Sequence, residues 1–462
     1  MYRQKMRLKW QRLYQHASKL IGPITLTAKP MGEHLERHRW NSLYLIAALT
    51  MIFMALAVAA QPLYLRKVMN ISPESAGTVN ANVQVITELL ALLAVGWLGF
   101  LSDRFGRVPL VVAGFMIGAC GGFLAPVSFA LGTFLGIGGV VLYYFSRLIM
   151  VFGTSAVWPQ LTTLAGDFTV YRSRAHYLAN ANFMMAFGST IAFTVLMQIP
   201  RFSGILPVML LNALLGLLGA LLAHRLLIDI APKRCSDSIP WQRVRDVIIQ
   251  EPKLRIAFAV SLFSRSDIIL IGLFYMLWTI YYAESAGLSQ EAAAARAGVL
   301  IGYVGILVMV TILVWGQVVQ RVGRIKAIIG GLSISGAGFL LMLFVDNPFS
   351  PFVYIPMTMI SLGQASLILA PDILALDIAP QDMRGSIMGP MNVVSGVGLI
   401  IILEIGGLLF DALGPHAPFV FTGIGNFIVL LYIINVYRYL PKFVAEDENT
   451  DKIIDSSNQG KF

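Results

Sequence analysis

The chain has 462 residues, of which 57% are apolar and only 13% are charged. A mean hydropathy of +0.74 excludes an ordinary soluble domain and indicates a chain that lies in a lipid bilayer. The net charge of +10 does not indicate nucleic-acid binding, because the basic residues are scattered among loops between apolar runs. With only Cys120 and Cys235 present, we expect neither a disulfide framework nor a metal site, and no cofactor.

The first predicted element is a cytoplasmic basic segment, residues 1–40. Met6, Trp10, Leu13 and Leu20 recur at helical spacing among nine Lys and Arg residues. This pattern predicts an amphipathic helix on the surface of an anionic membrane. A solvated tail without regular structure is the alternative interpretation.

Twelve apolar runs follow, each long enough to cross a bilayer as a helix. We therefore predict an all-α polytopic membrane protein with two six-helix halves, 41–226 and 256–440. A cytoplasmic linker, 227–255, joins the halves, and a cytoplasmic tail, 441–462, ends the chain. The predicted spans are 41–65, 77–101, 108–130, 135–158, 176–198, 204–226, 256–282, 298–319, 326–345, 352–375, 386–410 and 417–440.

The distribution of basic residues predicts the orientation. If the amino terminus is inside, 28 of the 34 Lys and Arg residues fall on the inner side. Only Arg66, Lys67, Arg201 and Arg296 fall outside. Because positive residues collect on the cytoplasmic side of a membrane, both termini are predicted to be cytoplasmic.

A charged turn links the second and third spans and is repeated 217 residues later. The first copy comprises Gly99, Asp103, Arg104, Gly106 and Arg107, and the second comprises Gly316, Arg321, Gly323 and Arg324, with Gln320 in the place of Asp103. Gly106 can take the positive φ that a short turn requires. A second repeated pair, Asp167/Arg174 and Asp377/Arg384, is offset by 210 residues. The chain is therefore predicted to contain two homologous halves.

Gly-x-x-x-Asp-Arg-x-Gly-Arg between the second and third spans, with a degraded copy between the eighth and ninth, resembles the signature of the major facilitator superfamily. The resemblance covers about residues 40–441 and implies a secondary transporter that works by alternating access. Val108 and Pro109 stand where that motif usually continues with basic residues. We expect the turns to act as gates, with Arg107 bound to Asp167 and Arg324 bound to Asp377.

Charged residues within the spans are the candidates for substrate binding and proton coupling, since an ionised side chain at bilayer depth costs about 2.5–3.5 kcal/mol. Glu88, Arg147, Arg265 and Asp267 fall near the midplane of their predicted helices. In the family that the chain resembles, spans one, four, seven and ten line the central cavity, which favours Arg147, Arg265 and Asp267. We expect Asp267 to carry the coupling proton, with Glu88 as the second candidate. Structural pairing is the alternative for each, and Glu404 is a weaker candidate.

Aromatic residues complete the candidate site: Tyr143 on span four, and Tyr275 and Trp278 on span seven. Tyr275 and Trp278 are predicted to contact the solute, with helix packing as the alternative. The 20 methionines form no cluster with histidine, so metal transport is disfavoured. Gly188-Ser-Thr-Ile-Ala-Phe stands where the family's antiporter motif would lie, which argues against drug/proton antiport.

The sequence thus predicts a transporter and not an enzyme. It moves a small organic solute, carboxylate-bearing if the two midplane arginines contact it, and is coupled to protons. An exporter of drugs or siderophore-like compounds is the alternative within transport, and a membrane sensor or assembly partner with the same fold is the alternative outside it. We expect a monomer in the bacterial inner membrane.

Overall fold

The computed structural model describes residues 33–167, 174–229, 241–264, 269–378 and 384–439. Residues 1–41 and 42–462 form separate units, and every contact described below lies within the second. The predicted surface helix, the carboxyl-terminal tail, and Arg265 with Asp267 fall outside the described residues.

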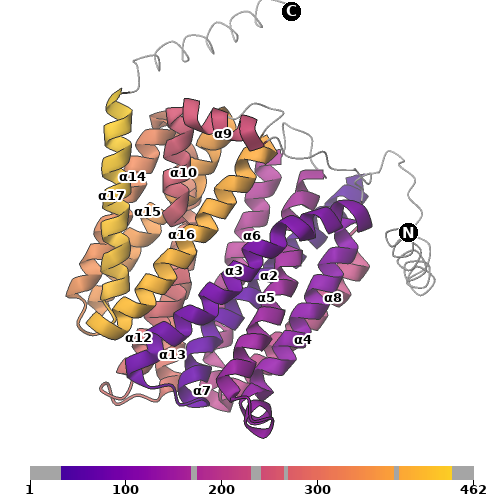
Figure 1. The fold of residues 1–462 in the computed structure, drawn as a ribbon, viewed down its shortest axis with the longest axis vertical. Coiled ribbons are helices and arrows are strands. Elements are labelled where there is room, and N and C mark those ends of the chain that lie inside the picture. The colour runs from indigo at the N-terminus through magenta and orange to yellow at the C-terminus, as the bar shows by residue number, and fades with distance from the viewer. Residues whose placement is uncertain (1–32, 168–173, 230–240, 265–268, 379–383, 440–462) are drawn as a thin grey trace, which may run out of the picture. The chain divides into compact units, whose positions relative to one another are not determined.

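The amino half consists of helices alone in the described part (Figure 1). Its elements are α2 (Glu33–Lys67), η1 (Pro73–Ser75), α3 (Ala76–Phe105), α4 (Arg107–Phe134), α5 (Gly139–Asp167), α6 (Arg174–Thr194), η2 (Leu196–Gln198), α7 (Pro200–Ser203) and α8 (Ile205–Leu226).

The carboxyl half follows the same plan. Its elements are α9 (Trp241–Gln250), α10 (Pro252–Ser264), the π-helical η3 (Ile271–Tyr275), α12 (Met276–Tyr282), α13 (Gln290–Val322), α14 (Arg324–Leu341), η4 (Met342–Phe344), η5 (Pro351–Val353), α15 (Tyr354–Ile378), α16 (Arg384–Leu413) and α17 (Ala417–Tyr439). Helix α9 lies within the predicted linker.

The all-helical membrane fold that the sequence predicts is confirmed. Eleven helices of the described part are long and apolar enough to cross a bilayer, and a shorter apolar helix runs over Ile271–Tyr282. Several boundaries differ from expectation. Helix α13 begins at Gln290 and not at 298, and α5 ends at Asp167 and not at 158. The first helix begins at Glu33 because it continues beyond its apolar stretch, and the predicted span 256–282 is described as α10 and η3–α12 on either side of 265–268. A π-helical turn at Ile271–Tyr275 often accompanies a functional position in a helix.

Matching glycine contacts show the internal repeat in three dimensions. Between α4 and α5, a Cβ added to Gly114 would lie 2.6 Å from the carbonyl oxygen of Gly153. Between α14 and α15, a Cβ added to Gly331 would lie 3.0 Å from the carbonyl oxygen of Gly363. The two pairs are offset by 217 and 210 residues, the same offsets as the repeated motifs. Small residues let helix backbones approach closely in a membrane, and both halves use them at equivalent crossings.

The two halves meet mainly through α3 against α16 and through α6 against α13 (Figure 1). Gly298 and Gly302, one turn apart on α13, face Phe193 and Thr194 of α6 so closely that a Cβ at either position would clash. Because Gly298 and Gly302 have no side chains, α13 can pack closely against α6 of the other half.

Candidate functional site

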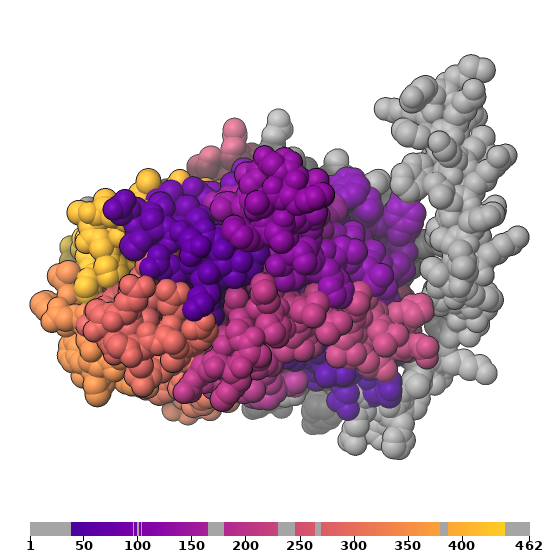
Figure 2. Space-filling model, turned by 90° about the horizontal axis from the view of Figure 1, so that it is seen from below, coloured from indigo at the N-terminus to yellow at the C-terminus, as the bar shows by residue number. Residues whose placement is uncertain are grey.

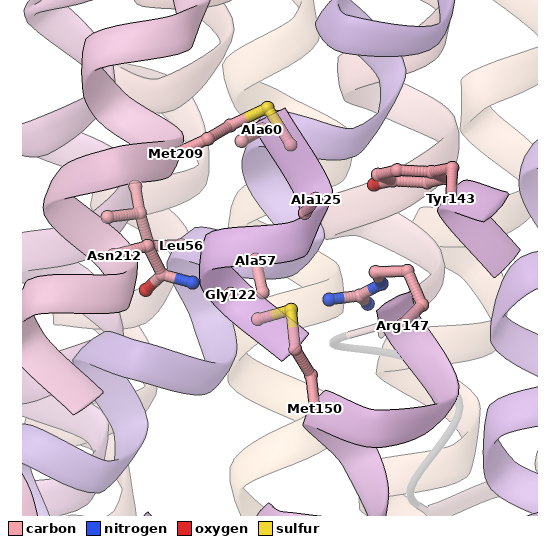
Figure 3. Close-up of a pocket in the computed structure, with 10 residues that line it drawn as sticks. All are labelled: Leu56, Ala57, Ala60, Gly122, Ala125, Tyr143, Arg147, Met150, Met209 and Asn212. Carbon is pink, nitrogen blue, oxygen red and sulfur yellow. The ribbon is translucent and has the colours of Figure 1, made fainter. Parts of the chain in front are cut away.

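Arg147 and Tyr143 lie together on α5 and line a cavity inside the amino half (Figure 3). The side chains of both are buried, Arg147 being 3% exposed and Tyr143 1%. The cavity is lined by Leu56, Ala57, Ala60, Gly122, Ala125, Tyr143, Arg147, Met150, Met209 and Asn212, which come from α2, α4, α5 and α8. The structure thus surrounds Arg147 with helices of its own half.

Glu88 lies at the contact between the halves. It is half-buried on α3, and its Oε1 lies 3.1 Å from the position that a Cβ of Gly396 on α16 would occupy. This placement brings a carboxyl group within the membrane to a surface that must move if the halves rock against each other.

Tyr275 and Trp278 are both buried in the carboxyl half. Tyr275 makes a hydrogen bond there, and Trp278 packs against other rings. The Tyr275 hydroxyl donates to the carbonyl oxygen of Pro348, 2.6 Å away. The Trp278 ring lies edge-on to Tyr275, with 6.3 Å between centroids, and packs against His416 at 4.7 Å. These contacts fix both rings, and their role as solute contacts stays a prediction.

The two repeated turns have the backbone that the sequence predicts. Gly106 has φ 98° and Gly323 has φ 93°, a region that glycine adopts without strain. At the second turn, Arg324 Nε donates to Asp377 Oδ2 at 2.9 Å, as expected. The gating role of both turns stays a prediction.

At the first turn, an acceptor that sequence reasoning missed appears. Asp229 Oδ2 accepts from the backbone N–H groups of Arg107, at 2.6 Å, and Val108, at 3.4 Å, so it caps the amino terminus of α4. The side chains of Asp103 and Asp167 fall outside the described residues, so the expected pair of Arg107 with Asp167 is not tested. Arg104 is exposed and lies over the ring of Phe105, 5.6 Å from its centroid.

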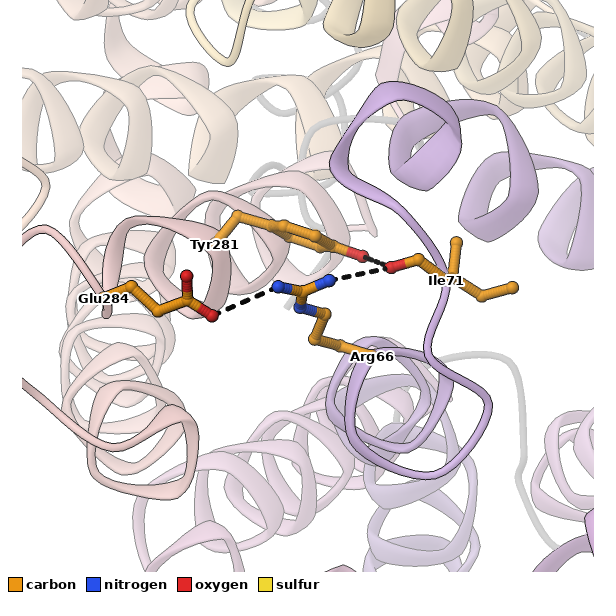
Figure 4. A network of polar contacts seen from close by, with 4 residues as sticks. All are labelled: Arg66, Ile71, Tyr281 and Glu284. Carbon is orange, nitrogen blue, oxygen red and sulfur yellow. Dashed lines mark hydrogen bonds and ion pairs between the residues drawn. The ribbon is translucent and has the colours of Figure 1, made fainter.

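Ionic contacts join the halves at the end that carries residues 68–75 and 283–289, which the Lys/Arg distribution predicts to be the outer one. Arg66 Nη2 lies 3.1 Å from Glu284 Oε1 (Figure 4). The Nη1 of Arg66 and the hydroxyl of Tyr281 both donate to the carbonyl oxygen of Ile71, at 3.2 and 3.0 Å. The guanidinium also stacks on the Tyr281 ring, 4.9 Å from its centroid.

Two further contacts lie at the same end. Lys67 Nζ is 3.2 Å from Glu291 Oε1, and Asp411 of α16 accepts from the backbone N–H groups of Gly77 and Thr78, at 2.6 and 2.8 Å. Together with the Arg66 contacts they form a set that we call the outer closure: Arg66, Lys67, Ile71, Gly77, Thr78, Tyr281, Glu284, Glu291 and Asp411. Segments of the two halves lie side by side on this face of the molecule (Figure 2).

The outer closure was not predicted from the sequence, although a signal for it exists. Arg66 and Lys67 are two of only four basic residues on the predicted outer side, so the acidic residues on that side can form ion pairs with few cations. As for metals, the described residues contain no group of three His, Cys, Asp or Glu side chains that could hold an ion.

Comparison with known proteins agrees with this architecture. The model of the family described as "Major Facilitator Superfamily" matches residues 43–401 and 268–455. The chain is 50% identical over 398 residues to the magnetosome protein MamH of Paramagnetospirillum magneticum, covering 86% of this chain and 92% of that protein. It is 35% identical over 398 residues to the magnetosome protein MamZ of Magnetospirillum gryphiswaldense, covering 85% of this chain and 61% of MamZ.

Among solved structures, a mutant of the nucleoside transporter NupG superposes with a TM-score of 0.68 at 13% identity, covering 86% of this chain and 99% of that one. The D-xylose-proton symporter superposes with a TM-score of 0.67 at 15% identity, covering 87% and 98%. At such low identity these likenesses show the fold alone. With the family match and the repeated turns, they establish that the chain belongs to the major facilitator superfamily of membrane transporters and is not an enzyme.

Proposed function

We propose that this protein is a secondary active transporter that moves a small organic solute by alternating access and is coupled to protons. The outer closure is the observation that carries the proposal. Its described ion pairs join opposite halves, Arg66 to Glu284 and Lys67 to Glu291. A solute can enter from outside only if these contacts separate, so the arrangement corresponds to the state of the cycle that is closed to the outside.

The strength of the outer closure suits a reversible gate. Glu284 is 70% exposed and Lys67 53%, so each ion pair contributes about 0.2–1 kcal/mol. The cap that Asp411 provides on α3 contributes about 0.5–2 kcal/mol. The sum of a few kcal/mol is within what differential binding of a solute can overcome.

Proton coupling requires a carboxyl group whose charge changes during the cycle. Glu88 has a suitable position, because it lies at the contact of α3 with α16. Asp267 remains the candidate that the sequence favours. A protonated carboxyl is nearly neutral in an apolar environment, and it can release its proton when the surrounding helices open to water.

The carboxylate-bearing solute stays a proposal from the sequence, since it depends on the two arginines near the midplane. Of these, Arg147 is enclosed by α2, α4, α5 and α8.

As to location, we propose that both termini face the cytoplasm. The relatives named magnetosome proteins favour the magnetosome as the compartment over the general inner membrane.

The test is transport by the purified chain in liposomes across a panel of organic solutes, with and without an imposed proton gradient. We expect at least one solute to accumulate only with the gradient, and a protonophore to abolish accumulation. Empty liposomes provide the control. If solute exchanges across the membrane but does not accumulate under the gradient, transport is not coupled to protons. If no solute in the panel moves at all, the sensor interpretation is favoured.

A further inference from the structure

Arg147 is a cation that is buried within the amino half. Its side chain is 3% exposed, and its Nε has no hydrogen-bond acceptor. The part of the chain that the structure describes contains no ion pair of this guanidinium. A charged group is stable away from water only when opposite charge or acceptors surround it, so the environment of Arg147 is incomplete as the described residues provide it.

Three donors converge on the space beside Arg147. Figure 3 shows the guanidinium and the hydroxyl of Tyr143 directed into the cavity from one side, and the amide nitrogen of Asn212 from the other. Asn212 is itself 4% exposed, and Tyr143 1%. None of the ten residues that line the cavity is Asp or Glu. A site with one positive charge, further N–H and O–H donors and no carboxylate is complementary to an anion.

The size and charge of the site limit what it can hold. Ala57, Ala60, Gly122 and Ala125 are small residues that line the cavity, and they leave room for about one water-sized group. The space therefore suits a single small ion and is too small for a drug-sized ligand. Because a single arginine compensates a single negative charge, a monovalent anion fits better than a divalent one.

We propose that the amino half binds one small monovalent anion, such as chloride, between Arg147, Tyr143 and Asn212. The anion supplies the charge that Arg147 lacks and bridges α5 to α8, which carry these residues. The site is enclosed by one half only, so binding does not depend on the proposed transport cycle.

The test measures anion binding directly on the full chain in detergent. Equilibrium dialysis with radiolabelled chloride is expected to give one ion per chain, with unlabelled chloride as the competitor and the bulky gluconate without effect. Arg147→Met should lower the affinity at least about tenfold, because it removes the charge. Tyr143→Phe should lower it by a smaller factor, because it removes one donor. Arg201→Met, which removes an exposed arginine of the same half, is the matched control and should bind as the parent does.

Thermal stability provides a second measurement, which also shows whether the variant is folded. Replacing a buried unpaired charge by an apolar side chain of similar length is often tolerated, so Arg147→Met is expected to fold. Chloride in place of gluconate should raise the melting temperature of the parent by about 2 °C or more and leave that of Arg147→Met unchanged. The proposal is wrong if the parent binds no small anion, or if Arg147→Met binds chloride as tightly as the parent.

Discussion

The Asp411 carboxylate of α16 accepts a hydrogen bond from the backbone N–H of Gly77, 2.6 Å away, at the first turn of α3. A helix amino terminus of one half is thus capped by a side chain of the other. The close contact between α3 and α16 requires a glycine on each helix. A Cβ at Gly77 of α3 would lie 2.7 Å from Asp411, and a Cβ at Gly407 of α16 would lie 2.6 Å from Ala81. Such a cap exists only while the outer ends are together.

The first prediction concerns this cap. Asp411→Ala should increase the fraction of molecules that are open to the outside by about 2- to 30-fold, which corresponds to the loss of about 0.5–2 kcal/mol. Spin labels at Ser72 and Ser285, exposed residues of opposite halves, would report the distance between the outer ends. Glu74→Ala is the control, because Glu74 carries the same charge close by and makes no hydrogen bond or ion pair with the described residues of the other half. An unchanged distance distribution in Asp411→Ala would show that the cap does not hold the gate.

The second prediction ranks the two partners of one ion pair. Glu284→Gln should have a small effect on the same distance distribution, because the side chain is 70% exposed and a surface pair contributes about 0.2–1 kcal/mol. Arg66→Gln should have a larger one. Arg66 is 20% exposed and also loses its bond to the Ile71 carbonyl and its stacking on Tyr281. Equal effects of the two variants would mean that the ion pair alone matters.

Several of these features could be predicted from the sequence, and the reason is local. Gly106 has the positive φ expected of it, because a short turn between two long helices requires it, and Gly323 in the repeated turn has it too. The pair of Arg324 with Asp377 follows from the repeat. Asp411 and Asp229 were missed, because hydropathy shows which segments span a membrane but not which helix ends meet.

The surroundings of Arg147 could not be predicted for a different reason. Successive residues of an α-helix point about 100° apart, so the direction of a side chain depends on how the helix is rotated about its axis. Sequence shows that rotation only when one face is clearly more apolar than the other. Helix α5 carries apolar residues on every side, and its sequence therefore did not show that Arg147 is directed between α2, α4 and α8.

The third prediction tests the repeated helix crossings. Gly153→Ala and Gly363→Ala should both reduce the yield of folded protein severely, because each new Cβ would clash with backbone atoms of the facing helix, α4 or α14. Gly389→Ala is the matched control, since a Cβ there meets nothing within 4 Å. That change should be neutral or stabilise the helix by up to about 1 kcal/mol. Size-exclusion profiles of the detergent-solubilised variants measure the outcome, and a normal profile for Gly153→Ala would refute the equivalence of the two crossings.

The fourth prediction identifies the residue that carries the coupling proton. Glu88→Gln and Asp267→Asn each mimic a permanently protonated carboxyl, and the variant at the coupling position should still exchange solute across the membrane but should not accumulate it under a proton gradient. The sequence favours Asp267, whereas the structure places Glu88 against Gly396 at the contact between the halves, where opening of α3 from α16 would admit water. Glu74→Gln, at an exposed glutamate outside the long membrane helices, serves as the control and should accumulate solute as the parent does. Accumulation and exchange of labelled solute, measured side by side in liposomes, separate coupling from simple loss of transport. If both Glu88→Gln and Asp267→Asn accumulate solute normally, neither carboxyl couples proton movement to transport.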